Sequence, residues 1–281
     1  MKLCSFTYRG RASYGVLMPN GRIVDLASRL GSQHSNLLSL VRSGSFQAAR
    51  DVIAGGAQGD LAESEVDYLP LLSGDIAIHC VGLNYAAHTA EAGVKQPDFP
   101  RTFIKVPAAL VGHRQPFEKP TLSPQFDFEG EIAVVIGKTA RRVKAADAEA
   151  YIAGYTCFMD GSVRDWQLER TLDQGKNFYR SSSMGPCLVT PDEVGPLAKL
   201  AITTIVSGEQ MQHSGFDKMI FPVPRLIEYI SSFTELRPGD VIATGTPEGV
   251  GFKRKPPRYL QSGDKVEVTV QNVGTLVNEV A

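Results

Sequence analysis

Acidic residues alternate with other residues along one short stretch of the chain, at Asp127, Glu129 and Glu131. The apolar run IAVVIG that follows predicts a strand, in which alternate side chains point to the same face. Like charges in line on one strand repel one another and resist burial, so they need either an exposed edge or a bound cation. Oxygen ligands at this spacing suit a hard ion, Mg²⁺ first, with Mn²⁺ or Ca²⁺ as substitutes.

A further acid, Asp160, ends the apolar segment AGYTCFMD, which predicts a neighbouring strand. If the two strands pair, Asp160 can complete a three-carboxylate site with Glu129 and Glu131. An exposed edge would explain the acids but not the apolar residues around them, which are typical of a packed sheet. The second acidic segment therefore favours the metal site.

His88 and Glu91 lie three residues apart in a segment with helical spacing, AAHTAEAG. On one helical face they can pair, and a carboxylate that accepts one ring proton raises the basicity of the other nitrogen. The competing interpretation is a solvated pair on a surface helix. From these two residues alone, that second interpretation is favoured.

Polar residues with the chemistry of substrate contacts follow the acidic segments. Arg164 and Gln167 would project together from a short helix, and Lys176 lies in a Gly-Lys-Asn-Phe loop. Such cations can neutralise the acids, hold an anionic substrate or polarise a carbonyl. Thr246 lies in the turn ATGTPEGVG, whose glycines match neither phosphate-binding pattern, so we expect it to present a hydroxyl to a substrate instead.

Bulk properties exclude several classes of protein. The 281 residues are 43% hydrophobic and 21% charged, with a net charge of −1. This balance gives no electrostatic reason to expect nucleic acid or a membrane as a partner. The four cysteines are scattered, without the spacing of a zinc site or a disulfide framework. The start MKLCSFTYRG lacks the apolar core of a signal peptide, so we expect a cytoplasmic protein.

The elements that must position these residues predict a strand-rich α+β fold. Glycine and proline are plentiful, at 27 and 17 residues, which favours turns and strands over a helical bundle. We expect a small N-terminal α+β domain over residues 1–70 and a metal-binding catalytic domain over 71–281, with the polar stretch 56–75 as a linker. An amphipathic helix is predicted over 223–233. His113, in a Gly-His-Arg-Gln-Pro turn, is expected to be exposed.

Seven ordered stretches together resemble the fumarylacetoacetate hydrolase family: VGLNYAAHTAE, DFEGEIAVVIGK, GYTCFMDGSVRDWQ, GKNF, SMGPCLVT, ATGTPEGVG and KPPRYLQSGDKVEV. The resemblance covers residues 76–281, about three quarters of the chain. It implies a mixed β-sandwich roll that holds one Mg²⁺ or Mn²⁺, usually in a homodimer.

The family resemblance also implies roles for single residues. The implied metal ligands are Glu129, Glu131 and Asp160. The implied catalytic groups are His88, Glu91 and Lys176. The implied substrate contacts are Arg164, Gln167, Thr246 and Tyr85, the last from the Gly-Leu-Asn-Tyr corner. The chain departs from the family pattern around Met159 and Gly161, over residues 177–180, and at Glu248, where proline is frequent; these positions alter the pocket wall.

The function that this resemblance implies is metal-dependent hydrolysis of a carbon–carbon bond in an acylpyruvate or related β-diketo acid. His88, oriented by Glu91, would activate water, and the products would be pyruvate and a carboxylic acid. Oxaloacetate-type decarboxylation, isomerisation and hydrolysis of a diketo-deoxy sugar acid are alternatives on the same scaffold. A metal-stabilised binding protein without turnover is a remote alternative, since it would have no use for the pair of His88 and Glu91.

Overall fold

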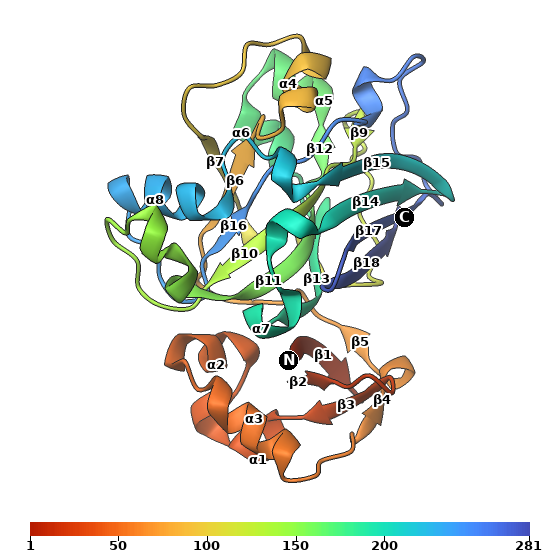
Figure 1. The fold of residues 1–281 in the computed structure, drawn as a ribbon. Coiled ribbons are helices and arrows are strands. Elements are labelled where there is room, and N and C mark those ends of the chain that lie inside the picture. The colour runs from red at the N-terminus through yellow and green to blue at the C-terminus, as the bar shows by residue number, and fades with distance from the viewer.

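The computed structural model describes all residues 1–281, and a large mixed sheet runs through it (Figure 1). Its strands are β1 Lys2–Tyr8, β2 Arg11–Leu17, β3 Arg22–Asp25, β4 Leu61–Ala62, β5 Asp67–Tyr68, β6 Ile78–Gly82, β7 Arg101–Lys105, β8 Leu110–Val111, β10 Gly130–Ile136, β11 Ile152–Met159, β13 Ser182–Val189 and β16 Val241–Ala243. Their order is β4-β3-β2-β1-β13-β11-β10-β16-β6-β7, with β5 on β1 and β8 on β13. The pairs β16–β6 and β13–β8 are parallel, which makes the sheet mixed.

A second, four-stranded sheet packs on one face of β10, β11 and β13. Its strands are β14 Ala201–Val206, β15 Glu209–Gly215, β17 Lys265–Val270 and β18 Gly274–Glu279, in the order β15-β14-β17-β18. Ile132 and Val134 of β10 enter the core between the sheets, while Ala133 and Val135 enter the core on the opposite face. Because both faces are covered, β10 is apolar throughout. The predicted strand-rich α+β fold with a mixed sandwich is confirmed.

Residues 1–70 form a unit at one end of the molecule (Figure 1). Its helices are α1 Ala27–Leu30, α2 Leu37–Ser43 and α3 Phe46–Ala54. Leu3 of β1 pairs opposite Leu188 of β13, so the strands of this unit continue the large sheet. The stretch 56–75 contains β4 and β5, which add to that sheet, so its interpretation as a linker is wrong. The division into a small N-terminal domain, residues 1–70, and a catalytic domain, residues 71–281, stays a prediction.

The elements around the acidic residues gather at the other end of the molecule (Figure 1). They are α4 Ala86–Ala92, α5 Arg164–Glu169, α6 Leu172–Lys176 and the paired short strands β9 Phe126–Asp127 and β12 Ser162–Val163. The predicted continuous acidic strand is wrong, because β9 and β10 are separate strands in different sheets. β9 pairs with β12, and this pairing takes Asp127 out of line with the two glutamates.

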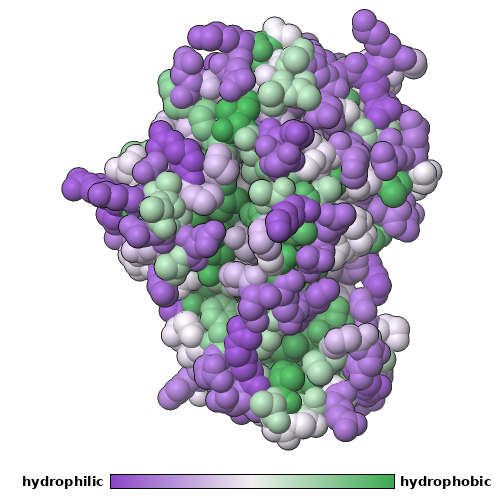
Figure 2. Space-filling model, in the orientation of Figure 1, coloured by the Kyte–Doolittle hydropathy of each residue, from purple (hydrophilic) through white to green (hydrophobic).

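The remaining helices are short, except α8 Val223–Phe233, which confirms the predicted amphipathic helix by burying Leu226, Ile227 and Ile230. The others are α7 Pro191–Val194 and the 3₁₀ turns η1 Ser32–His34, η2 Glu63–Glu65, η3 Pro107–Ala109, η4 Ala145–Tyr151, η5 Leu197–Lys199, η6 Phe216–Lys218 and η7 Gly251–Lys253. None of the helices combines the length and the apolar character needed to cross a bilayer. On the face in Figure 2, hydrophilic residues cover most of the surface, with hydrophobic residues visible between them.

His113 is buried, with 4% of its surface exposed, so the prediction of an exposed histidine is wrong. Its Nδ1 accepts a hydrogen bond from the Val277 amide at 3.0 Å, and its ring meets the Tyr68 ring edge-on, with centroids 4.8 Å apart. The turn is pinned in place because the Arg114 amide donates to the Val277 carbonyl of β18. A short turn signal in the sequence does not reveal such a long-range contact.

Candidate metal centre

The carboxylates of Glu129, Glu131 and Asp160 form one buried cluster, with ligand oxygens within 4.8 Å of one another. The pairing of β10 with β11 assembles it: Gly130 lies opposite Met159, and the Asp160 amide donates to the Glu129 carbonyl at 2.9 Å. The strand pairing that the sequence suggested therefore does bring these three acids together. Their role as metal ligands stays a prediction.

Gly130, between the two glutamates, lets the second sheet approach the cluster closely. A Cβ atom at this position would lie 2.0 Å from Thr204 Oγ1, far inside van der Waals contact. Its amide donates to Gln212 Oε1 at 2.9 Å, and its carbonyl accepts from Thr246 Oγ1 at 2.9 Å. Both backbone groups are thus satisfied by side chains, which fixes the strand between the glutamates.

Two cations contact the cluster directly. Lys176 Nζ lies 2.7 Å from Glu129 Oε2 and 2.7 Å from Asp160 Oδ2. Arg164 Nη1 lies 2.6 Å from Glu129 Oε1. Both side chains are almost fully buried, so they are held by these acids rather than by solvent.

Lys105 is a third buried cation, which the sequence analysis missed. Its Nζ lies 2.8 Å from Asp160 Oδ1, donates to Ser182 Oγ at 2.9 Å and also contacts the Lys176 carbonyl. The available signal was alternation on β7, because Phe103 and Lys105 share the buried face of that strand. A lysine two residues from a buried phenylalanine is a candidate for an internal ion pair.

The electrostatics of the two glutamates differ. Burial raises the pKa of Glu131 well above its usual value, and the neighbouring Asp160 and Glu129 raise it further. Burial would also raise the pKa of Glu129, but the charges of Lys176 and Arg164 outweigh it and lower that pKa to about 2. Glu131 is the carboxylate with the least compensation by protein cations.

The donor set fits a hard divalent ion. All three ligands are carboxylates, and Asp160 Oδ1 is buried without a hydrogen-bond partner of good geometry although Lys105 lies close to it. Oxygen-only coordination of this kind suits Mg²⁺ or Mn²⁺. The residues that would hold the ion are Glu129, Glu131 and Asp160.

His88 and Glu91 form the predicted pair on α4. His88 Nδ1 lies 3.1 Å from Glu91 Oε2, and Glu91 Oε1 accepts from the Gly249 amide at 3.0 Å. The histidine is buried, so the solvated surface pair, which was favoured from these two residues alone, is wrong. The turn 245–249 joins the pair to the carboxylate cluster, because the Gly245 amide donates to Glu131 Oε2 at 2.8 Å and the Gly249 amide donates to Glu91.

The four predicted substrate contacts differ in how many of their polar groups already have a partner within the protein. Arg164 Nη1 donates to Gln167 Oε1 at 2.9 Å, while Arg164 Nη2 is buried without a partner. Thr246 Oγ1 accepts from Gln212 Nε2 at 2.7 Å and donates to a backbone carbonyl, so its hydroxyl is engaged. Tyr85 is buried; burial raises its phenol pKa, and Glu131 raises it further. Arg164 Nη2 is therefore a buried donor that the protein itself leaves without an acceptor.

Gln212 was also missed by the sequence analysis. Its amide joins β10 to the turn at Thr246, since Nε2 donates to Thr246 Oγ1 and to the Pro247 carbonyl at 2.9 Å. Gln212 lies on β15, whose face toward the first sheet is buried. A buried glutamine on an otherwise half-exposed strand carries no distinctive pattern, so sequence alone offered little signal for it.

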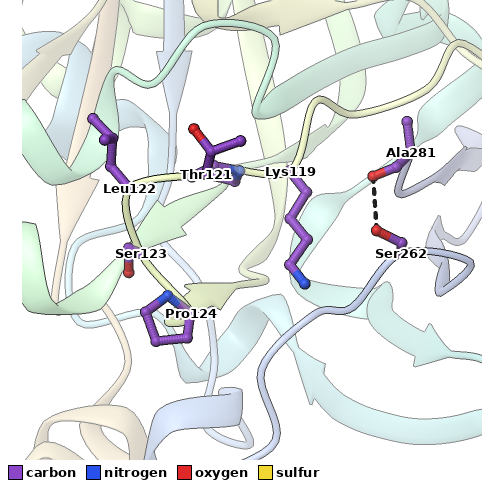
Figure 3. Close-up of a pocket in the computed structure, with 8 residues that line it drawn as sticks. Lys119, Thr121, Leu122, Ser123, Pro124, Ser262 and Ala281 are labelled. Atoms are coloured by element: carbon purple, nitrogen blue, oxygen red, sulfur yellow. Dashed lines mark hydrogen bonds between the residues drawn. The ribbon is translucent and has the colours of Figure 1, made fainter.

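Figure 3 shows a surface pocket of about 590 Å³ whose lining includes no residue of the acidic cluster. It is lined by residues 119–124 together with Ser262 and the C-terminal Ala281, and Ser262 Oγ donates to the Ala281 carbonyl at 3.0 Å. It contains none of the charged groups described above. We therefore assign the candidate site to the carboxylate cluster.

Known proteins resemble this chain in sequence. The family described as fumarylacetoacetate (FAA) hydrolase C-terminal matches residues 77–281. Oxaloacetate tautomerase FAHD2A, mitochondrial, from Bos taurus is 43% identical over 223 residues, which cover 78% of this chain and 71% of that protein. Oxaloacetate tautomerase fahd2, mitochondrial, from Xenopus laevis is 35% identical over 269 residues, covering 94% of this chain and 84% of that protein.

Solved structures resemble the chain over its whole length. A fumarylacetoacetate hydrolase from Exiguobacterium antarcticum has a TM-score of 0.84 at 32% identity, covering 100% of this chain and 99% of that one. Maleylpyruvate hydrolase from Sphingobium sp. SYK-6, in complex with manganese(II) ion and pyruvate, has a TM-score of 0.83 at 26% identity, with the same coverage. These relatives and neighbours are enzymes, and a divalent metal accompanies one of them. The chain belongs to the fumarylacetoacetate hydrolase family.

Proposed function

We propose that this chain is a divalent-metal-dependent enzyme that interconverts the keto and enol forms of oxaloacetate or a closely similar β-keto acid. The observation that carries the proposal is the buried pair of His88 and Glu91, joined to the carboxylate cluster through the turn 245–249. Named oxaloacetate tautomerases at 43% and 35% identity support this choice of substrate.

The metal would be Mg²⁺ or Mn²⁺, with Ca²⁺ as a substitute in vitro, held by Glu129, Glu131 and Asp160. When bound, it would polarise the keto oxygen of the substrate and stabilise negative charge there. With Asp127, these acids make four buried carboxylates against the three cations Lys105, Arg164 and Lys176. When all are charged, a divalent ion brings the total to a net positive charge, which suits an anionic substrate.

The protein residues supply the proton transfer and the orientation. Glu91 accepts from His88 Nδ1, so Nε2 keeps its lone pair and can take a proton from carbon 3 of the substrate. Returning that proton to the oxygen on carbon 2 completes the isomerisation without any other reactant. Arg164 Nη2 would hold a substrate carboxylate, and Lys176 would stabilise charge on the enol oxygen.

Hydrolysis of a carbon–carbon bond in an acylpyruvate is the second candidate. In this case His88 would take a proton from water, and a hydrogen-bond donor would stabilise the oxyanion at the distal carbonyl. The similarity to the maleylpyruvate hydrolase of Sphingobium sp. SYK-6 supports this candidate. However, the Thr246 hydroxyl already donates to the Gly130 carbonyl, so it is not free to stabilise that oxyanion. Tautomerisation needs no such oxyanion donor, which is why we rank it first.

One assay separates these reactions, as well as decarboxylation and the binding protein without turnover. Enol oxaloacetate is followed by its ultraviolet absorbance with Mg²⁺, with and without a chelator, while carbon dioxide is measured in parallel. Acetylpyruvate and fumarylpyruvate are tested for release of pyruvate. We expect chelator-sensitive loss of the enol signal without carbon dioxide. Pyruvate from the diketo acids alone would establish the hydrolase instead, and carbon dioxide alone would establish the decarboxylase. Inactivity on all substrates would favour a sugar-acid substrate or the binding protein.

The matched variants for this assay are both histidine substitutions. His88→Ala should lower turnover by about 10²–10⁴-fold while metal affinity changes little, because the base is removed and the ligands remain. His213→Ala is the control, since His213 is an exposed histidine of β15 that bonds only Thr203. Full activity of the His88→Ala enzyme would contradict the assignment of the base.

Assembly and compartment are also part of the proposal. We propose a homodimer that covers an apolar hollow beside the site, where Val106, Leu122, Trp166 and Phe178 contribute the hydrophobic lining. Leu122→Glu should then shift the mass measured by light scattering from dimer to monomer. We also propose the cytoplasm as compartment, in keeping with four cysteines that are all free thiols, and cell fractionation tests it.

A further inference from the structure

We propose that Asp127 is a positioning residue. It holds the substrate-binding Arg164 and the turn 249–253, which contacts Glu91 of the His88–Glu91 pair, in a single fixed arrangement. The sequence pattern places Asp127 in line with Glu129 and Glu131, but its hydrogen bonds are made elsewhere, to the turn and to Arg164. This inference rests on the proposed function for its kinetic consequences, but not for its structural ones.

Asp127 is fully buried, and both of its carboxylate oxygens are used. Oδ1 accepts hydrogen bonds from the amides of Phe128 at 2.8 Å and Gly251 at 2.9 Å. Oδ2 accepts from the Phe252 amide at 3.1 Å and from Arg164 Nε at 2.8 Å. One side chain therefore joins β9, η7 and α5, which are distant in the sequence.

The turn is pressed closely against this carboxylate. A Cβ atom at Gly251 would lie 2.4 Å from Asp127 Oδ1 and 2.0 Å from the Arg258 carbonyl oxygen. Only glycine, which has no Cβ, lets the backbone at residue 251 come close enough for its amide to bond the Asp127 carboxylate. The same turn places the Phe252 ring over the Arg164 guanidinium, with 4.3 Å between the ring centroid and Cζ.

These contacts determine the orientation of Arg164. Nε is committed to Asp127, and Nη1 is shared by Glu129 and Gln167. Because the guanidinium is planar, fixing these two nitrogens also fixes the direction of the unpartnered Nη2. A flexible arginine would lose this direction.

The other side of the turn holds the catalytic pair. The Gly249 amide donates to Glu91 Oε1 at 3.0 Å, and Lys253 Nζ donates to the Ala92 carbonyl at the end of α4 at 3.2 Å. Both contacts come from residues within two positions of Gly251. Asp127 therefore acts on Glu91 through the turn, without touching it.

The carboxylate is required because four N–H groups converge on it. An asparagine can keep two of them on its single oxygen, but its amide nitrogen would face Arg164 Nε and the Phe252 amide, which are donors. Asp127→Asn is therefore almost isosteric, yet it should release both the guanidinium and the turn.

The test compares Asp127→Asn with Asp240→Asn. Asp240 is an equally buried aspartate that accepts the amides of Ala77 at 2.8 Å and Arg237 at 2.7 Å, but it does so at the opposite end of β16 from the site. Mn²⁺ binding, and oxalate binding in the presence of Mn²⁺, are measured by calorimetry on the full chain. Oxalate serves as a planar dianion that resembles the enol form. Thermal unfolding and the pH profiles of kcat and kcat/KM are recorded for each variant.

We expect Asp127→Asn to weaken oxalate binding and to lower kcat by about 10–100-fold each, with Mn²⁺ affinity within a factor of about three of the parent. The acid limb of its kcat profile should move, since Glu91 no longer orients His88 firmly. Asp240→Asn should lose thermal stability but keep oxalate affinity and the parental pH profile.

The proposal is overturned if Asp127→Asn binds oxalate like the parent and keeps its pH profile, or if Mn²⁺ and oxalate binding fall together. Failure of Asp127→Asn to fold, with Asp240→Asn folded, would assign Asp127 to folding and would also overturn it. If the parent enzyme does not act on oxaloacetate, the proposed function fails, but the difference in oxalate affinity still decides the role of Asp127.

Discussion

Acidification should destabilise this protein through His113, a residue that has no part in the proposed chemistry. Its Nδ1 accepts the Val277 amide, so the folded state requires the neutral ring. Burial lowers the pKa of His113 to about 4 from an ordinary value of 6.5, and the neighbouring positive charge of Arg114 contributes to this. In the unfolded chain the ring has its ordinary pKa.

The sign and size of the effect follow from proton linkage. Between pH 6.5 and about 4 the unfolded chain binds a proton that the folded chain does not, so the free energy of unfolding rises with pH in this window. The stabilisation is fully present above pH 6.5 and is lost as the pH falls through about 4. A gap of about 2.5 pH units corresponds to about 3 kcal/mol in total.

Urea unfolding between pH 4 and 8 measures this contribution, using His113→Asn as the variant. Asparagine can still accept the Val277 amide but does not titrate, so the difference in unfolding free energy between parent and variant should change with pH by about 3 kcal/mol. Exposed His213 provides the control, because His213→Asn should leave the parental pH dependence unchanged. A parent and a His113→Asn variant with parallel pH dependence would refute the reasoning.

Three further substitutions test the site. Glu129→Ala should abolish Mn²⁺ binding in calorimetry together with turnover, and a fully active variant without metal would exclude this ligand set. Lys105→Met should lower the free energy of unfolding in urea by about 3–5 kcal/mol, since Asp160 loses a buried cation; a change below 1 kcal/mol would contradict this. Gly130→Ala should cost about 1–3 kcal/mol, because its Cβ would meet Thr204 Oγ1. Adding Thr204→Ala should recover part of that loss, and no recovery would mean that the clash lies elsewhere.

Local alternation was sufficient to predict the acidic cluster. Glu129 and Glu131 precede an apolar strand, and Asp160 ends the next one, so simple antiparallel pairing brings them together. The motif around His88 and Glu91 was equally local, three residues apart on one short helix. The contact that brings the residues together is the pairing of β10 with β11 in the first case and a single turn of α4 in the second.

The features that sequence could not provide depend on contacts between distant segments. Lys105 reaches Asp160 across 55 residues of sequence, and Gln212 reaches Gly130 across 82. The position of Asp127 is determined by pairing of β9 with β12 and by the approach of η7, neither of which leaves a local pattern. Burial of His113 likewise depends on β18, at the end of the chain.

The pairing of Leu3 with Leu188 has a consequence for attempts to shorten this protein. An unpaired strand edge offers its N–H and C=O groups to any other chain, which promotes aggregation. The N-terminal strands therefore shield β13 from neighbouring molecules in solution. A fragment reduced to residues 77–281, the part that matches the family, would contain every charged group of the site. It would also expose the edge of β13 that β1 covers in the full chain. Such a fragment should therefore aggregate because of the unpaired strand edge, although its site residues are all present.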